Sequence, residues 1–433
     1  MNTATSSAVP ANLLTSSLTP SPRIASIDAL RGLVMFSMIY VNDIAGVSGN
    51  IVPVWMHHYR GRSGMTFVDL VFPAFLFIVG MSIPFAIGSR LNKGEPLWKT
   101  LLHVVIRTLS LLFIGIIMVN ESPDSAKMGW SATLWSALMY LSAILAFCSI
   151  SHPSKSETAT NRERTFRIIS LCVRVVGYAS LVFLAFAFRG ENGHRIITLS
   201  PFSIRTEWYG ILGLIGWAYL VAAIVFLLFR GHRTALLGCT VLLFCLYPAD
   251  RTGAFQNFWL ANFVGIGETL GSQAAISAAG LLLASILLAP DVTTVGSRTR
   301  FSLLFIAGCV AAALLLQGLY GINKNNATPS WCLWACAITT AIWLVFYFLC
   351  DIRPQGGLAK LAKPFAIAGQ NVLLAYLLSN LLGPVLELLH LDGWYYHLAQ
   401  PDLAHAVTRS VGCAVVILSL SIAINRIGFR LRL

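Results

Sequence analysis

The residues best suited to chemistry lie in one short stretch, from Val54 to Gly80, where two adjacent histidines precede an aspartate. Histidine is the side chain that changes its protonation state most readily near neutral pH. His58 stands eleven residues before Asp69, and a carboxylate that accepts one imidazole proton makes the other ring nitrogen more basic. The stretch, which also contains His57, therefore predicts a histidine that acts as a general base or as an acyl-accepting nucleophile. The alternative is a surface loop in which Asp69 only complements the positive end of a helix.

Four further polar residues stand at the ends of apolar segments. Asn42 and Asp43 close the first apolar segment, shortly before the two histidines. Lys324 and Asn325 lie in the sequence GINKNNATPSW, which leads into a later apolar segment. Amide and ammonium groups donate hydrogen bonds, so Asn42, Lys324 and Asn325 can bind a carbonyl oxygen or a sugar hydroxyl. The alternative for Lys324 and Asn325 is a helix cap at the membrane interface.

Ionisable and amide side chains also occur at the opposite ends of such segments. Asp28 and Arg31 lie three residues apart near the start of the first apolar segment, where they can pair on one helix face. Ionisable groups in a membrane span are costly, so the pair indicates either a structural anchor or a binding site. Gln370 and Asn371 begin another helix, whose free backbone N–H groups would suit a phosphate.

The composition identifies the elements that must position these residues. Of 433 residues, 57% are hydrophobic and only 11% are charged, which excludes a soluble domain of this size. The apolar runs are long enough to cross a hydrocarbon core of about 30 Å as helices, and they lack the alternation of a membrane barrel. We predict an all-α polytopic bundle of eleven or twelve transmembrane helices, since one run is short and another contains Pro384. The predicted spans are 29–47, 66–89, 98–119, 131–150, 165–188, 208–230, 233–248, 270–289, 300–319, 331–350, 364–390 and 405–425.

The positions of the basic residues orient this bundle. With the N-terminus in the cytoplasm, eighteen of the 30 Lys and Arg residues fall in inner segments, nine in outer segments and three within spans. Cytoplasmic loops are enriched in Lys and Arg, so the bias predicts that both termini are cytoplasmic and that His57 and His58 face outwards. It also explains the net charge of +13 without a nucleic-acid partner. The outer loops are rich in aromatic residues, which is typical of an interfacial belt or of a saccharide site.

The ends and the cysteines add little chemistry. Residues 1–22 carry no charged side chain and are rich in Ser, Thr, Pro and Ala, which predicts a disordered tail. Residues 23–433 then form a single membrane domain. Cys332 and Cys336 share one helix face but lack a further ligand nearby, so no metal site is predicted.

Four segments carry a resemblance to a known family. In order along the chain they are RIASIDALRG, MTFVDLVFPAFLFIVGMSI, GINKNNATPSW and PFAIAGQNVLLAYLL. They resemble the ordered motifs of the heparan-α-glucosaminide N-acetyltransferase family of membrane acyltransferases, and the DLVFP core is the most specific of them. The resemblance implies transfer of an acetyl group across a bilayer, from acetyl-CoA on the cytoplasmic side to a glucosamine amine on the lumenal side. It also implies a catalytic histidine in the first outer loop.

The resemblance assigns roles to the residues named above. It places the catalytic role on His58, with His57 as the second choice and Asp69 as the group that orients the ring. The family histidine precedes the aspartate by about ten residues, whereas His58 precedes Asp69 by eleven and is doubled by His57. The expected ligands of the thioester carbonyl or the sugar are Asn42, Asp43, Lys324 and Asn325. The expected contacts of acetyl-CoA are Arg23, Asp28, Arg31, Gln370 and Asn371.

The organisation of the chain is similar to that of bacterial relatives, so we expect a location in the bacterial inner membrane. The expected acceptor is a small amino sugar or a cell-envelope glycan at the periplasmic face, and the expected surroundings are membrane lipid. The resemblance favours a homodimer. Two other readings stay open. A bundle of this kind with aromatic and amide groups also suits a sugar or small-solute transporter, although no repeat relates the two halves. The third reading is a non-catalytic scaffold.

Overall fold

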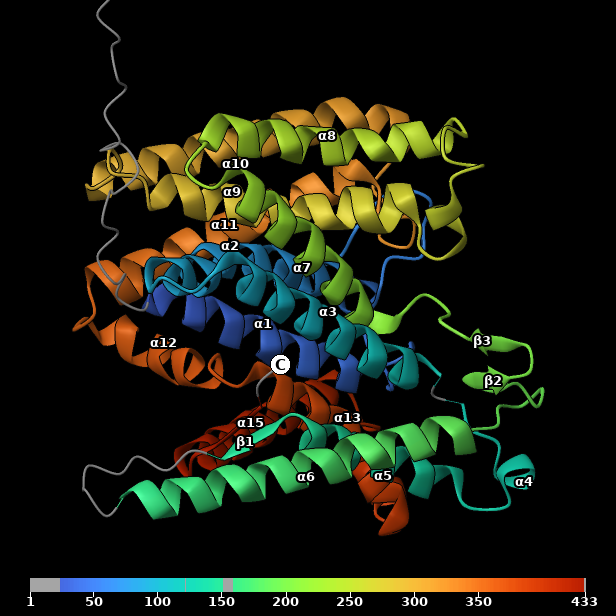
Figure 1. Ribbon diagram of the computed structural model, residues 1–433. Coiled ribbons are helices and arrows are strands. Elements are labelled where there is room, and N and C mark those ends of the chain that lie inside the picture. The colour runs from blue at the N-terminus through green and yellow to red at the C-terminus, as the bar shows by residue number, and fades with distance from the viewer. Residues whose placement is uncertain (1–23, 121, 151–158, 432–433) are drawn as a thin grey trace, which may run out of the picture.

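The computed structural model describes residues 24–120, 122–150 and 159–431. Arg23 and the predicted tail at residues 1–22 lie outside the described residues. The described part is built almost entirely from helices, and most of the long ones run side by side (Figure 1). The α-helices are α1 (Ala25–Ile44), α2 (Val71–Asn92), α3 (Leu97–Val119), α4 (Ser125–Met128), α5 (Ala132–Ala146), α6 (Ala159–Ala187), α7 (Gly210–Phe229), α8 (Arg233–Arg251), α9 (Ala274–Leu287), α10 (Val295–Tyr320), α11 (Pro329–Phe346), α12 (Gly357–Ala368), α13 (Val372–Leu388), α14 (Asp392–His397) and α15 (Leu403–Arg426).

Short elements join and extend these helices. Two π-helical segments extend α9 and α11, and three 3₁₀ turns lie in loops. Two pairs of strands, β1 with β4 and β2 with β3, form small antiparallel ladders. The bounds of these elements are η2 (Val54–Met56), η3 (Phe67–Leu70), η4 (Trp259–Asn262), η5 (Ile266–Gln273), η6 (Tyr347–Ile352), β1 (Cys148–Ile150), β2 (Ile197–Leu199), β3 (Phe202–Ile204) and β4 (Phe429–Leu431).

The prediction of a polytopic helical membrane protein is confirmed. Every predicted span contains a helix, and nine helices of the described residues are long and apolar enough to cross a membrane. A bent pair, α12 with α13, would be a tenth. Two predicted spans are not among these helices. The span 29–47 corresponds to α1, which carries the charged residues Asp28, Arg31 and Asp43, and the span 131–150 corresponds to α5, which is only 15 residues long.

The predicted single helix over 364–390 is wrong. The chain breaks at Gly369 to Asn371, and α12 and α13 meet at an angle of 77°. The break coincides with a close crossing of α12 over α1, because a Cβ built on Gly369 would lie 2.0 Å from the carbonyl oxygen of Asp28. Pro384, the residue that the sequence offered as the point of interruption, lies inside α13 instead.

A second close crossing holds α2, the helix that follows the predicted catalytic loop. A Cβ built on Gly80 of α2 would lie 1.8 Å from the carbonyl oxygen of Ser277 on η5–α9, and one built on Gly280 would lie 2.1 Å from that of Phe77. Small residues let membrane helices approach closely, and contact between the backbones then replaces the hydrophobic driving force that lipid does not supply. The crossing therefore fixes α2 in the middle of the bundle.

We expect Gly80→Ala to destabilise the protein, because its methyl group would overlap the backbone of α9. Overpacking of this kind costs about 1–3 kcal/mol. The matched control is Gly88→Ala on the same helix, where the nearest atom to the new methyl would be Phe226 Cζ at 3.9 Å. Thermal unfolding in detergent should show a lower Tm for Gly80→Ala and an unchanged or higher Tm for Gly88→Ala. Equal Tm values for the two variants would contradict the close contact between α2 and α9 at Gly80.

Candidate active site

The carboxylate of Asp69 is the buried centre of the loop between α1 and α2. Asp69 lies in η3, where it forms a reciprocal capping box with Thr66, and its side chain is only 2% exposed. Its Oδ2 atom accepts hydrogen bonds from the backbone N–H groups of Thr66, at 3.0 Å, and of Tyr59, at 3.1 Å. A buried carboxylate needs such partners to remain charged. They leave Oδ1 directed at one further group.

That group is the imidazole of His58. Its Nδ1 atom lies 2.7 Å from Oδ1 of Asp69, and the side chain remains 51% exposed. An ionised carboxylate can only accept a hydrogen bond, so Nδ1 is the protonated nitrogen when the ring is neutral. Nε2 then carries the lone pair. The loop thus presents a half-exposed histidine whose tautomer is set by Asp69, and its catalytic role stays a prediction.

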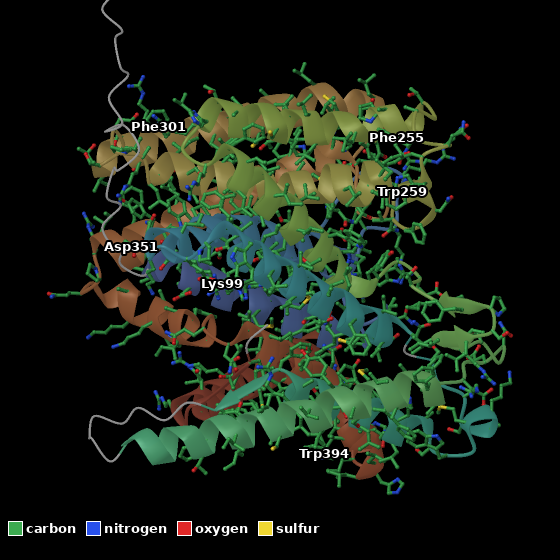
Figure 2. All side chains as sticks on the ribbon, in the orientation of Figure 1. Lys99, Phe255, Trp259, Phe301, Asp351 and Trp394 are labelled. Carbon is green, nitrogen blue, oxygen red and sulfur yellow. The ribbon has the colours of Figure 1, made fainter. Side chains whose placement is uncertain are left out.

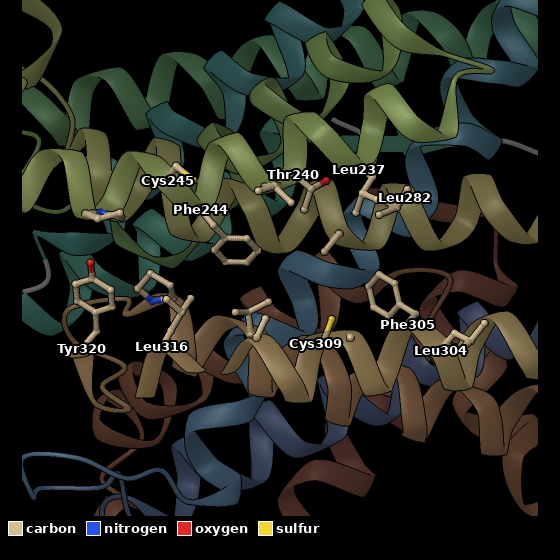
Figure 3. Close-up of a pocket in the computed structure, with 17 residues that line it drawn as sticks. Leu237, Thr240, Phe244, Cys245, Leu282, Leu304, Phe305, Cys309, Leu316 and Tyr320 are labelled. Atoms are coloured by element: carbon tan, nitrogen blue, oxygen red, sulfur yellow. The ribbon is translucent and has the colours of Figure 1, made fainter. Parts of the chain in front are cut away.

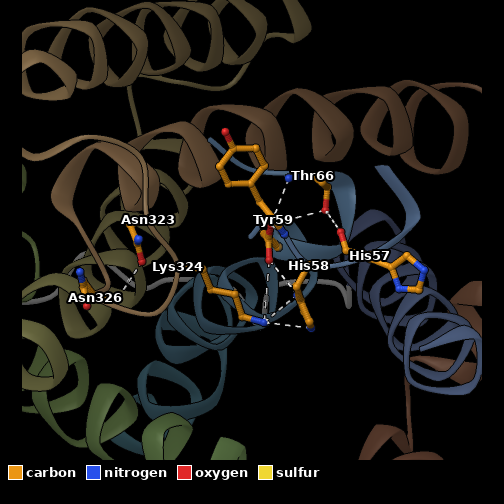
Figure 4. A network of polar contacts seen from close by, with 8 residues as sticks. His57, His58, Tyr59, Thr66, Asn323, Lys324 and Asn326 are labelled. Atoms are coloured by element: carbon orange, nitrogen blue, oxygen red, sulfur yellow. Dashed lines mark hydrogen bonds and ion pairs between the residues drawn. The ribbon is translucent and has the colours of Figure 1, made fainter. Parts of the chain in front are cut away.

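Lys324 reaches the same pair from the loop between α10 and α11. Its Nζ atom lies 3.1 Å from Nδ1 and 3.3 Å from Nε2 of His58, and 4.0 Å from Oδ1 of Asp69 (Figure 4). Burial lowers the pKa of Lys324 below the usual lysine value, and the nearby Asp69 charge counteracts that shift. One carboxylate and one ammonium therefore lie beside the same imidazole.

The two loops are joined by two hydrogen bonds. Gly64 N–H donates to the carbonyl oxygen of Ile322 at 2.8 Å, and Ile322 N–H donates to Oγ of Ser63 at 2.9 Å. Gly64 has a φ of +156°, a conformation that favours glycine. These bonds hold Lys324 over His58, although 266 residues separate the two in sequence.

The structure separates the two histidines. The His57 ring points away from Lys324 (Figure 4), and its Nε2 atom is buried without a hydrogen-bond partner among the described residues. Its backbone carbonyl oxygen accepts a bond from Oγ1 of Thr66 at 2.7 Å. His57 thus shapes the loop, whereas His58 contacts the charged groups. The choice of His58 over His57 stays a prediction.

Of the four predicted acceptor residues, only Lys324 joins this cluster. Asn325 and Asn42 are exposed. Asp43 belongs to a different network: its carboxylate accepts bonds from Tyr395 at 2.6 Å, Ser410 at 2.6 Å and Arg409 at 3.1 Å. Within the part of the chain that the structure describes, no hydrogen bond or ion pair connects Asp43 with His58. The Asp43 network ties the C-terminal end of α1 to α14 and α15.

Sequence reasoning missed the residues that hold the cluster together. Thr66 and the backbone of Tyr59 orient Asp69, and Ser63 joins the two loops. One signal was available, because the sequence Thr66-Phe-Val-Asp69 has the spacing of a capping box. The role of Ser63 had no signal, since it depends on a loop far along the chain.

The predicted inner residues also meet, with one difference. Asp28 and Arg31 form an ion pair at 2.9 Å, and Arg31 donates further bonds to Oγ of Ser82 at 2.7 Å and to the carbonyl oxygen of Gly369 at 3.2 Å. The break before α13 is therefore in contact with α1. The side chain of Asn371, however, bonds to β4 through Phe429 at 3.4 Å and Leu431 at 3.2 Å. Gln370 is partly buried beside it.

A cavity of about 340 Å³ lies at the end of the bundle where α1 begins, and it was not predicted. Its lining includes Ile24, Arg298, Trp343 and Asp351. Nε1 of Trp343 and Oδ2 of Asp351 are buried there without hydrogen-bond partners among the described residues. Figure 2 shows Asp351 near the end of the bundle opposite to Phe255 and Trp259. One signal for this cavity was available in the sequence. Asp351 directly follows the predicted span 331–350, and an ionisable residue at such a position indicates a functional site.

These features define a polytopic helical membrane protein with a His–Asp–Lys cluster at one end of the bundle and, at the other, a cavity whose lining includes Arg298 and Asp351. A sequence-family profile described as "Domain of unknown function (DUF5009)" matches residues 23–199. The chain is 34% identical over 109 residues to human heparan-alpha-glucosaminide N-acetyltransferase, and 34% identical over 108 residues to the mouse protein. Each match covers 25% of this chain and 16% of the relative. The resemblance to this group of proteins is thereby confirmed for that part of the chain.

Proposed function

We propose that this protein is a membrane acetyltransferase, which moves an acetyl group from acetyl-CoA on the cytoplasmic side to the amine of an amino sugar or glycan at the outer face of a bacterial inner membrane. The observation that carries the proposal is the 2.7 Å contact between His58 and the buried Asp69, with Lys324 beside both. The similarity to the human N-acetyltransferase supports the reaction class. The count of basic residues supports the orientation.

The His–Asp–Lys cluster supplies each group that amine acylation needs. Nε2 of His58 accepts the proton that the amine loses as its nitrogen bonds to the acetyl carbon, and Asp69 stabilises the resulting imidazolium. Nζ of Lys324 donates to the carbonyl oxygen that gains negative charge, and a donor in that role contributes about 3–4 kcal/mol. The C–S bond then breaks while the C–N bond remains, and the sulfur takes the proton from Nε2 of His58, so that a thiol leaves and the imidazole returns to its neutral form.

A second route uses the same atoms. Nε2 of His58 attacks the acetyl carbon itself and then passes the group to the amine. Incubation with acetyl-CoA alone separates the two routes. A histidine nucleophile releases one equivalent of free thiol per protein before any acceptor is added, whereas a general base releases none.

The inner end offers groups that fit the donor. Acetyl-CoA would supply an activated acetyl thioester on a long arm of amides. Trp343 and Asp351, with one unpartnered donor and one unpartnered acceptor, suit such amides, and Arg298 suits a phosphate. Arg31 and Asp28 lie at the same end of α1. The 20 residues of α1 span about 30 Å between this end and the outer loop, which is about the thickness of the hydrocarbon core.

The test uses sealed vesicles in which the N-terminus faces outwards, with radiolabelled acetyl-CoA outside and glucosamine inside. We expect labelled N-acetylglucosamine inside the vesicles. Leakage is monitored by adding acetyl-CoA to vesicles without protein. Passage of unmodified glucosamine in the absence of acetyl-CoA would replace the proposal by a transporter. Product formed only when both substrates are on one side would contradict transfer across the membrane.

A further inference from the structure

An apolar cavity lies outside the site discussed so far. It has a volume of about 450 Å³ and lies between α8 and α10, with further walls from α9 and α11 (Figure 3). Its lining contains no charged side chain. The hydroxyl of Thr240, one of its few polar atoms, donates to the carbonyl oxygen of Leu236 in its own helix at 2.8 Å. The cavity therefore matches hydrocarbon and offers no site for a polar ligand.

The cavity is elongated along the helices. Its lining follows α10 from Leu304 to Tyr320, which is about 24 Å of helix at 1.5 Å per residue. Three of the residues that line it, Leu237 and Val241 on α8 and Leu304 on α10, are themselves more than half exposed. A chain in the bilayer can therefore reach the cavity from the side. The elongated shape and the apolar lining of the cavity therefore suit a long, linear hydrocarbon chain.

The outer end of the cavity adjoins the loop that carries Lys324. Tyr320, which ends α10, and Pro329, which begins α11, both line the cavity. They are the two residues that bound the loop 321–328. A molecule whose chain lies in the cavity consequently has its head group at this loop, which holds Lys324 against His58.

The charges beside this mouth favour a cationic head group. The ring of Tyr320 packs against that of Tyr247 with centroids 5.4 Å apart, and Arg251 lies over Tyr247. Arg251 pairs with Glu268 at 2.8 Å, and the adjacent Asp250 accepts a bond from Gly267 N–H at 2.9 Å. Glu268 thus pairs with Arg251, and the carboxylate of Asp250 lies near that of Glu268, beside the aromatic rings. An ammonium group on a sugar ring complements this arrangement.

We infer that the acceptor is an amino sugar linked to a lipid, whose hydrocarbon chain lies in the cavity between α8 and α10 while its amine is presented at the Lys324 loop. This inference rests on the proposed function and names its acceptor class. The lipid chain anchors the acceptor and takes no part in bond making. The amine alone forms the new C–N bond.

The experiment compares methyl and dodecyl β-glucosaminide as acceptors in detergent-solubilised protein. Gly308 lines the cavity and has no atom within 4 Å of a Cβ, so Gly308→Phe fills the space. Gly318→Phe is the matched control, because Gly318 lies on the same helix, is equally open and does not line the cavity. Partition of the dodecyl chain into detergent is the same for all three proteins, so differences between them report the cavity.

We expect Gly308→Phe to lower kcat/KM for dodecyl glucosaminide at least tenfold and to leave the value for methyl glucosaminide unchanged. Gly318→Phe should resemble the wild type with both acceptors. Equal losses with both acceptors, or no loss with either, would overturn the inference. So would a tightly bound phospholipid that Gly308→Phe displaces without any change in kcat/KM.

A binding measurement separates this inference from the proposed function. Binding can be measured without turnover, so the thermal shift caused by dodecyl glucosaminide is measured in the His58→Ala protein. If Gly308→Phe removes this shift and Gly318→Phe retains it, the result supports the lipid-linked ligand. If no acetylation is found in the same protein, only the proposed function fails. Acetylation of methyl glucosaminide without any cavity-dependent shift leaves the proposed function standing and overturns the inference.

Discussion

His58→Ala should reduce the rate of acetyl transfer by about 10²–10⁴-fold, the range that a positioned general base contributes. His58 is the imidazole whose Nδ1 is held by Asp69 and whose ring touches Lys324. The rate is measured as N-acetylglucosamine formed per protein at saturating acetyl-CoA. A loss of this size with a normal melting temperature would assign the chemistry to the side chain and not to folding.

His57→Ala is the matched control, because it removes a neighbouring imidazole from the same loop. The His57 ring makes no hydrogen bond among the described residues, and its buried Nε2 atom has no partner to lose. We expect activity close to that of the wild type. A third variant, Asp69→Asn, keeps the shape but can present an N–H to Nδ1 of His58, which favours the wrong tautomer, so it should be nearly as inactive as His58→Ala. An inactive His57→Ala protein beside an active His58→Ala protein would contradict the assignment.

The helical bundle could be predicted because the bilayer imposes one simple requirement on each segment. A stretch such as Leu97–Val119 must be long, apolar and hydrogen-bonded within itself to cross, and all three properties can be seen in the sequence. The break at Gly369 could not be predicted in the same way. It depends on how closely α12 approaches Asp28 of α1, and that distance is set by packing between distant segments.

The same distinction applies to the site. His58 and Asp69 belong to one loop, so their pairing followed from their spacing and chemistry. Lys324 was recognised as a polar residue at the outer face, but its contact with His58 requires the bond between Gly64 and Ile322 that joins two loops. Asp43 was expected near the histidines because it is close in sequence. Arg409 bonds to it from 366 residues away, and the side chain of Arg409 is only 3% exposed.

Lys324→Met should lower the rate of acetyl transfer by about 10²–10³-fold, the loss that follows removal of one donor to a developing oxyanion. Methionine keeps most of the length and the apolar stem of lysine, so the loop between α10 and α11 should retain its bonds to Ser63 and Gly64. An unchanged melting temperature would show that it does. Activity equal to that of the wild type would remove Lys324 from the reaction and leave it a structural contact.

The pH dependence of the rate gives a sharper test of the same lysine. Burial lowers the pKa of Lys324, so its ammonium group is present below that lowered pKa and is lost as the pH rises through it. The wild-type rate should therefore begin to fall at a pH below about 10.4, which is the usual pKa of an exposed lysine. An arginine stays charged throughout this range, so Lys324→Arg should keep its own maximal rate to higher pH, even if that rate is reduced by the larger side chain. Lys127→Arg, a substitution at a lysine paired with Asp124, is the control and should leave the profile unchanged. An alkaline limb that does not move in Lys324→Arg would mean that the loss of activity comes from another group, and the charge of Lys324 would then have no part in the reaction.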